Sequence, residues 1–304
     1  MSGGPAVALD KPVSNKRWWQ LVVGVVCMIA TANIQYAWTL FGPEIQQEFG
    51  WKRAEIQITF TIFVLVQTWL APIEGYFIDK LGPRLMVAFG ACFIGFAWYL
   101  NSQATSLTGF YVGAAFGGIG VGSIYATCIN NALKWFPDRR GLAVGLTAGG
   151  YGAGSAATIL PIAAMIETSG FQATFLFFGI LQGSLAFIAA WFLRSPAKGE
   201  VQASSKLAQA TRDYTLKEAL NTKLFWLMFL MFICVVTGGM MAVAQLGVIA
   251  QDLGVHDFKV DLHFWVMAAL PLALMLDRIM NGISRPLFGW ISDNIGREKT
   301  MVIA

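Results

Sequence analysis

The sequence predicts an all-α membrane protein whose long apolar helices cross the bilayer many times. Of its 304 residues, 56% are hydrophobic and 12% are charged, and the mean hydropathy is +0.60. This composition lies outside the range of soluble globular domains. Apolar stretches of about 20 residues recur along the chain, and each can cross a hydrocarbon core of roughly 30 Å as a helix. A short motif also occurs twice, once in each half of the chain.

Eight complete spans are predicted, at residues 18–41, 56–78, 85–100, 109–133, 142–166, 173–193, 224–250 and 262–291. The first is too long for a signal-peptide core and carries polar residues in its second half, so we expect it to be retained. A ninth span begins at Met301. Because a chain that stops inside an apolar span leaves backbone groups unpaired in lipid, we expect the sequence to belong to a longer protein.

Lysine and arginine are distributed unequally between the two ends of these spans. Sixteen lie on one side, and only Lys52, Arg53 and Lys259 lie on the other. The positive-inside rule then predicts a cytoplasmic N-terminus and a cytoplasmic middle loop. The net charge of +4 is spread over several loops rather than gathered in one patch, so no nucleic-acid partner is expected.

The loops are short except for residues 194–222, which are polar and rich in Ala, Ser, Gln and Lys. The predicted organisation is a cytoplasmic tail at 1–17, a six-helix bundle at 18–193, a cytoplasmic linker at 194–222 and the start of a second bundle at 223–304. For residues 215–220 the composition favours a solvated linker, and a short helix at the membrane surface is the alternative.

Residues typical of catalysis or metal binding are not arranged for either. The four cysteines all fall inside predicted spans and form no CxxC motif: Cys27, Cys92, Cys128 and Cys234. We expect them to be small buried hydrophobic side chains. His256 and His263 lie in an outer loop without a partner motif. We therefore expect no enzyme activity, no metal and no cofactor.

The repeated motif ends the second span and the eighth span. Residues 75–84 and 289–297 both read glycine, aromatic, two residues, aspartate, a polar residue, an aliphatic residue, glycine and a basic residue, with one proline inserted in the first copy. We expect the first glycine to allow close helix approach, the aspartate to accept hydrogen bonds from a helix start, and the second glycine to form a tight turn. Cytoplasmic gating is the predicted role, with a plain topogenic turn as the alternative, for Gly75, Asp79, Gly82, Arg84, Gly289, Asp293, Gly296 and Arg297.

On this repeat the chain resembles the major facilitator superfamily, whose transporters contain two six-span halves in parallel repeat. Within it the chain is similar to the oxalate:formate antiporter family and, more distantly, to the monocarboxylate transporters. The most specific segment is Lys-Trp-Phe-Pro-Asp-Arg-Arg-Gly at 134–141; the resemblance is also carried by residues 33–40, 75–84, 124–125, 130–133, 141–154 and 281–289. It implies two six-helix halves around a central cavity, in a protein that we expect to be a monomer.

Charged residues inside the eighth span are the first candidates for a substrate site, because charge is costly at membrane depth. Arg278 and Arg285 lie seven residues apart, on nearly the same helix face and about 10 Å from each other. A guanidinium group can grip a carboxylate with two hydrogen bonds. Asp277 is adjacent to Arg278, and since their side chains diverge by about 100° we do not expect them to pair face to face.

The resemblance implies that Arg285, which precedes Pro286, binds the substrate carboxylate; an arginine that reaches the cytoplasmic interface is the alternative. It also implies that four residues line the cavity, where hydroxyl groups donate to an anion and rings exclude water: Gln35, Tyr36, Tyr125 and Tyr151.

Three charged residues depart from the family pattern. For Asp277 a proton-carrying role and an ion pair with other helices remain open. For Arg278 an added anion site and a structural ion pair remain open. Glu74, just before the first copy of the motif, fits a gate or an anchor at the cytoplasmic edge better than a substrate role.

The predicted function is secondary active transport of small organic anions, mono- or dicarboxylates such as oxalate and formate, by alternating access. A cavity with uncompensated cations must bind an anion before it closes and reorients, which favours exchange of one anion for another. Proton symport of a monocarboxylate is the alternative if Asp277 titrates, and a membrane sensor with a transporter fold is the rival class. The expected partners are the anion and the lipid bilayer of the inner membrane.

Overall fold

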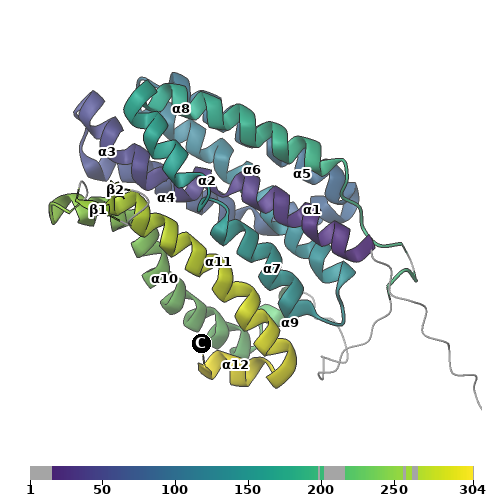
Figure 1. Cartoon of the computed structure of the whole chain (residues 1–304). Helices are drawn as coiled ribbons and strands as arrows, with labels where there is room; N and C mark the ends of the chain where they lie inside the picture. The colour runs from purple at the N-terminus through teal and green to yellow at the C-terminus, as the bar shows by residue number, and fades with distance from the viewer. Residues whose placement is uncertain (1–15, 198, 202–215, 256–257, 262–265, 304) are drawn as a thin grey trace, which may run out of the picture.

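The chain forms an elongated bundle of helices (Figure 1), seen in a computed structural model that describes residues 16–197, 199–201, 216–255, 258–261 and 266–303. Among these residues, four helical segments are long and apolar enough to cross a membrane by length and composition: Lys16–Phe49, Ala71–Gln103, Leu107–Trp135 and Ile159–Ala190. The predicted all-α membrane fold is confirmed.

The first predicted span consists of three helices, α1 (Lys16–Thr31), α2 (Asn33–Tyr36) and α3 (Trp38–Phe49). Pro43 lies inside α3 and supplies no backbone N–H to the carbonyl one turn earlier. The α3 helix ends at Gly50, whose φ of +66° is in the left-handed region. The first crossing is therefore interrupted where its polar side chains lie.

Two glycines with almost the same backbone angles divide the longest helices. The helix α4 (Arg53–Trp69) is followed by α5 (Ala71–Gln103), which is broken at Gly82 with φ +76° and ψ +171°. The helix α8 (Ile159–Ala190) is broken at Gly170 with φ +79° and ψ +165°. L-residues avoid this positive φ. The breaks lie between the predicted second and third spans and between the fifth and sixth.

Two more helices connect these segments, α6 (Leu107–Trp135) and α7 (Arg140–Ala153). The α6 helix packs against both α4 and α5, and α7 packs against α1 and α6. Aromatic side chains fill one end of the resulting core, where Phe41 stacks on Phe175 with ring centroids 4.0 Å apart and Trp98 lies fully buried beside them. The N-terminal helices thus form one continuous core that supports the polar residues of α2.

After α8 the chain folds back on this core. The backbone N–H of Arg194 donates to Oε1 of Gln20 (2.8 Å), and the indole N–H of Trp135 donates to the Arg194 carbonyl (2.9 Å). The Arg194 guanidinium donates two hydrogen bonds to Glu200 (2.6 and 2.8 Å) and lowers the pKa of that carboxyl to about 2. The start of the predicted linker is therefore held against the bundle.

The second part of the chain begins with α9 (Leu216–Leu220), α10 (Lys223–Asp252) and a hairpin, followed by α11 (Ala269–Ile295) and α12 (Arg297–Ile303). The preference for a solvated linker at 215–220 is wrong for the helical residues Leu216–Leu220. The indole N–H of Trp226 donates to the Leu220 carbonyl (2.8 Å), which stabilises the end of this short helix. Residues 202–215 lie outside the described part of the chain.

A two-stranded hairpin occupies the beginning of the predicted eighth span. The strand β1 (Lys259–Asp261) pairs antiparallel with β2 (Val266–Ala268), and the helix α11 begins at Ala269 rather than at residue 262. The β-branched residues Val260 and Val266 of the two strands favour extended backbone. Pro271 lies in the first turn of α11, where no backbone N–H is required.

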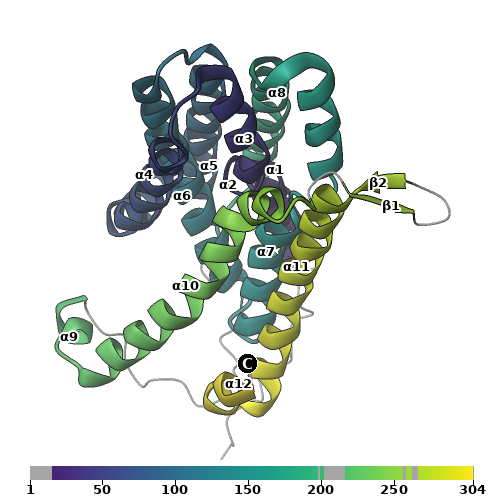
Figure 2. The ribbon, with the colours of Figure 1, turned by 90° about the vertical axis from the view of Figure 1, so that its left-hand side faces the viewer.

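The two parts meet along α7 and α11, which run side by side, whereas α10 diverges from α11 (Figure 2). The outward faces of α5 and α8 carry large exposed apolar side chains such as Phe96 and Ile180, as expected for a lipid-facing surface. Cys27 and Cys128 are buried, but the expectation of burial is wrong for Cys92 and Cys234, which are exposed. A thiol is apolar enough to lie on such a surface.

Candidate functional site

Three helices of the N-terminal part bring the predicted aromatic residues together. The rings of Tyr36 and Tyr125 lie 5.2 and 5.3 Å from the ring of Tyr151, measured between centroids. The Tyr151 hydroxyl donates to Oε1 of Gln35 at 2.6 Å. Tyr36, Tyr151 and Gln35 are buried and Tyr125 is half-buried. The structure therefore joins these four residues, from α2, α6 and α7, into one network.

Arg278 of α11 packs directly on this network. Its side chain is fully buried, and its guanidinium carbon lies 4.3 Å from the centroid of the Tyr36 ring, a cation–π contact. Its Nη2 donates to Oδ2 of Asp277, so the expectation that these neighbours do not pair is wrong. The long arginine side chain bends back to its neighbour in spite of the divergence of their Cα–Cβ directions. Nε and Nη1 of Arg278 have no hydrogen-bond partner among the described residues.

Arg285 lies two turns further along α11. Its side chain is half-buried, and its Nε donates to Oδ1 of Asn281 at 3.0 Å. Asn281 also lies near Tyr36, and Arg285 lies close enough to Tyr36 and Tyr151 for its charge to act on both. The cations of α11 thus face the aromatic and amide groups of the N-terminal helices.

Sequence reasoning did not identify two members of this network. Gln67 of α4 lies beside Tyr151, and Asn281 lies between Arg285 and Tyr36. Both are amides inside apolar spans, which is a signal that a site search can use. Asn281 also lies four residues before Arg285, on the same face of the helix.

The helices α7 and α11 contact each other through glycines. A Cβ at Gly145 would lie 2.5 Å from the carbonyl oxygen of Arg285, and one at Gly149 would lie 2.7 Å from that of Gly282. Pro286 has no N–H for the Gly282 carbonyl, so this carbonyl is available to face Gly149. The helix α11, which bears the predicted anion-binding residue Arg285, is therefore in backbone contact with the N-terminal part.

The first glycines of the two motif copies have different surroundings. Gly289 packs against the backbone of Gly141, as expected for a position of close helix approach. Nothing lies within 4 Å of a Cβ built at Gly75, so the same expectation is wrong for the first copy.

The aspartates of the two copies also have different partners. Asp293 accepts hydrogen bonds from the backbone N–H groups of Gly141 and Leu142, both at 2.8 Å, and so caps the start of α7. Asp79 instead forms an ion pair with Lys134 at 3.2 Å, and its side chain is 71% exposed. In the described part of the chain, only the second copy thus connects the two parts through its aspartate.

The remaining motif residues lie near the same end of the bundle. Gly82 and Gly296 have φ values of +76° and +95°, and both form turns that L-residues avoid. Arg84 is exposed, with its guanidinium carbon 6.0 Å from the Trp191 ring, and Arg297 is exposed at the start of α12.

Removing the Asp293 cap is expected to lower stability more than removing the Asp79 ion pair. Asp293→Ala leaves two N-terminal N–H groups of α7 unpaired, which costs about 1–2 kcal/mol, whereas Asp79→Ala removes an exposed pair worth at most about 1 kcal/mol. Thermal unfolding of the purified full-length variants measures the difference. Equal losses of Tm in the two variants would contradict the capping role.

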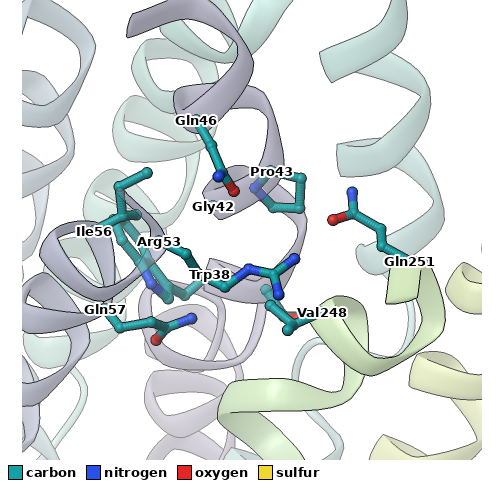
Figure 3. Close-up of a pocket in the computed structure, with 10 residues that line it drawn as sticks. Trp38, Gly42, Pro43, Gln46, Arg53, Ile56, Gln57, Val248 and Gln251 are labelled. Atoms are coloured by element: carbon teal, nitrogen blue, oxygen red, sulfur yellow. The ribbon is translucent and has the colours of Figure 1, made fainter. Parts of the chain in front are cut away.

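A second contact between the two parts lies at the opposite end, where α3 and α4 meet α10. The backbone N–H of Gly247 donates to Oγ1 of Thr39 at 3.1 Å, and Arg53 forms an ion pair with Asp252 at 3.3 Å. Figure 3 shows the small pocket at this contact, with Arg53 extending toward Val248 and Gln251. Its cavity volume is about 10 Å³, room for one water at most. The two parts therefore touch at both ends of their helices.

No group of three or more His, Cys, Asp or Glu residues able to hold a metal ion occurs in the described ranges. His256 and His263 lie outside them.

Several known proteins similar to this chain are membrane transporters. Residues 23–304 match the Major Facilitator Superfamily. The chain is 32% identical to the oxalate:formate antiporter of Oxalobacter formigenes over 299 residues, which are 98% of this chain and 69% of that protein. It is 24% identical to the uncharacterized MFS-type transporter YhjX of Escherichia coli over 94% of this chain and 69% of that protein. It is 25% identical to the probable sulfoacetate transporter SauU of Cupriavidus necator over 59% of this chain and 42% of that protein.

Proposed function

Because the chain belongs to the major facilitator superfamily, a family of membrane transporters and not of enzymes, we propose that it exchanges small carboxylate anions across the inner membrane. The substrates are mono- or dicarboxylates of the size of oxalate and formate. The protein acts as a monomer with its N-terminus in the cytoplasm, and it needs no cofactor.

One observation carries this proposal, the arrangement of Arg285 opposite the tyrosine and amide network. Arg278 is matched by the Asp277 carboxylate and the Tyr36 ring. Among the described residues, the Arg285 side chain donates its hydrogen bond to the neutral amide of Asn281. A cation at membrane depth requires a negative counterpart, and a substrate carboxylate supplies one with two charge-assisted hydrogen bonds.

Exchange follows from the cost of an empty site. The backbone of Arg285 contacts Gly145 of α7, so an anion at this side chain lies beside the contact between the two parts. Without an anion, closing the cavity transfers an unmatched guanidinium into a low-dielectric interior, which is unfavourable. With an anion the charges are paired, so the loaded protein reorients and the empty one does not.

The pairing of Asp277 with Arg278 favours exchange over proton symport through Asp277. The Asp277 carboxylate is the ion-pair partner of the fully buried Arg278 side chain. Asp277 therefore serves to balance Arg278, and Arg285 remains as the cation for the substrate.

The test is counterflow in proteoliposomes that contain the full-length protein. Labelled oxalate outside is expected to accumulate only when unlabelled oxalate or formate is present inside. Accumulation in empty vesicles under an inward proton gradient would favour symport, and binding of the label without any accumulation would favour a sensor. A control variant, Glu48→Gln on the exposed surface of α3, is expected to match the unmodified protein.

A further inference from the structure

A buried carboxyl group lies outside the anion site, on α5. The Glu74 side chain is 5% exposed, and Ser123 of α6 donates a hydrogen bond to its Oε1 at 3.2 Å. A Cβ at Gly122 would lie 2.7 Å from the same oxygen, so this glycine leaves the room that the carboxyl group fills. The carboxyl group is therefore enclosed between α5 and α6, and the gate or anchor near the cytoplasmic edge that the sequence indicated stays a prediction.

The charged groups on the helices around Glu74 are engaged elsewhere. On α5 and α6, Asp79 pairs with Lys134, and on α4, Arg53 pairs with Asp252. The other charged side chains of these helices also have partners: Glu55 accepts from the Lys52 backbone, Lys80 lies over the Tyr76 ring and Arg84 lies near the Trp191 ring.

Within the described residues, no basic group lies within ion-pair distance of Glu74, and its Oε2 has no hydrogen-bond partner. An unpaired carboxylate at membrane depth is far more costly than a neutral carboxylic acid, which leaves only one hydroxyl unpaired. The single hydrogen bond from the Ser123 hydroxyl does not offset the negative charge that an ionised Glu74 would carry, as a neighbouring cation would.

We propose that Glu74 is a proton-binding site, a neutral carboxylic acid in the closed form, in which the two parts touch at both ends of their helices, that releases its proton when the cavity opens to the cytoplasm. On release the O–H bond breaks, the proton passes to water and the carboxylate remains hydrated. This part of the inference rests on the proposed transport cycle, whereas the protonated state of the closed form does not.

The position of Glu74 connects it both to the anion site and to the cytoplasmic end. It follows Gln67, a member of the tyrosine network, by seven residues, and its partner Ser123 precedes Tyr125 by two. The exposed Asp79 lies five residues further on, a helical rise of about 7.5 Å. The proton therefore has a short route along this helix to the exposed end that carries Asp79.

The protonated state is tested by infrared spectroscopy on the purified full-length protein without substrate. The carbonyl stretch of a protonated carboxylic acid is expected, with a shift in deuterium oxide, and is expected to be lost in Glu74→Gln. Glu74→Asp retains a carboxyl group and should show a displaced band. The control Glu48→Gln should leave the band unchanged. A band that persists in Glu74→Gln overturns the assignment.

Proton release is tested by the pH dependence of oxalate exchange in proteoliposomes. The unmodified protein and Glu48→Gln are expected to share one pH dependence, and Glu74→Gln is expected to exchange oxalate with that dependence lost. An unchanged pH dependence in Glu74→Gln overturns release during the cycle, even if the infrared band is lost. Failure of the unmodified protein to exchange any anion would instead overturn the proposed function, and the infrared result would stand.

Discussion

Arg285→Gln is expected to lower oxalate exchange at least about 30-fold, because truncating one partner of a buried charge pair costs roughly 2–5 kcal/mol. Glutamine retains a hydrogen-bond donor but no positive charge, so the carboxylate loses its counterpart. The cost falls on the loaded form of the transporter and therefore reduces both affinity and turnover. Counterflow of labelled oxalate in proteoliposomes gives the rate, and equilibrium binding gives the affinity.

Two further variants separate charge from geometry. Arg285→Lys retains the positive charge but loses the planar fork, so an intermediate loss is expected. Lys299→Gln removes an exposed positive charge from the same helix α12 as Arg297 and is expected to leave exchange within about twofold, since exposed charges contribute little. Unchanged oxalate affinity and flux in Arg285→Gln would refute the proposed site.

Gly145→Ala is expected to prevent the close approach of α7 and α11 and to reduce exchange strongly. The added Cβ would lie 2.5 Å from the Arg285 carbonyl oxygen, which is backbone and cannot move aside as a flexible side chain would. Such overpacking costs about 1–3 kcal/mol, which lowers the population of the closed form by roughly 5- to 150-fold. Because the contact includes the Arg285 backbone, the anion site is disturbed at the same time.

Gly75→Ala is the matched control for this substitution. It changes a helical glycine in the same way, but nothing lies within 4 Å of the new Cβ, so exchange is expected to be retained. Spin labels at Arg139 and Glu298, both exposed, report the separation of the two helix ends by pulsed electron resonance. The distance should increase in Gly145→Ala alone. An equal distance in both variants would show that the glycine contact does not control closure.

The hydrophobic pattern was sufficient to predict the membrane fold, because span length and composition are local properties of the sequence. The two copies of the loop motif indicated the family, and their glycine turns have the backbone angles that glycine allows. Four predicted cavity residues lie in one network, since helix periodicity and family resemblance together constrain which face they occupy.

Features that depend on how helices meet were not predictable from the sequence. The pairing of Asp277 with Arg278 is set by the rotamer of a long side chain, and helix geometry alone argued against it. The roles of Gln67 and Asn281 require contacts between α4, α7 and α11. The open space at Gly75 and the crowding at Gly289 differ because their neighbours differ, although the motif is the same.

The two glycine breaks have a consequence for how the chain enters the membrane. Gly82 and Gly170 each separate two apolar helical segments by a single sharp break with almost the same backbone angles. Two breaks so alike give the insertion machinery little basis for telling the two places apart. We expect the neighbouring loop arginines and lysines to set which ends stay in the cytoplasm during synthesis.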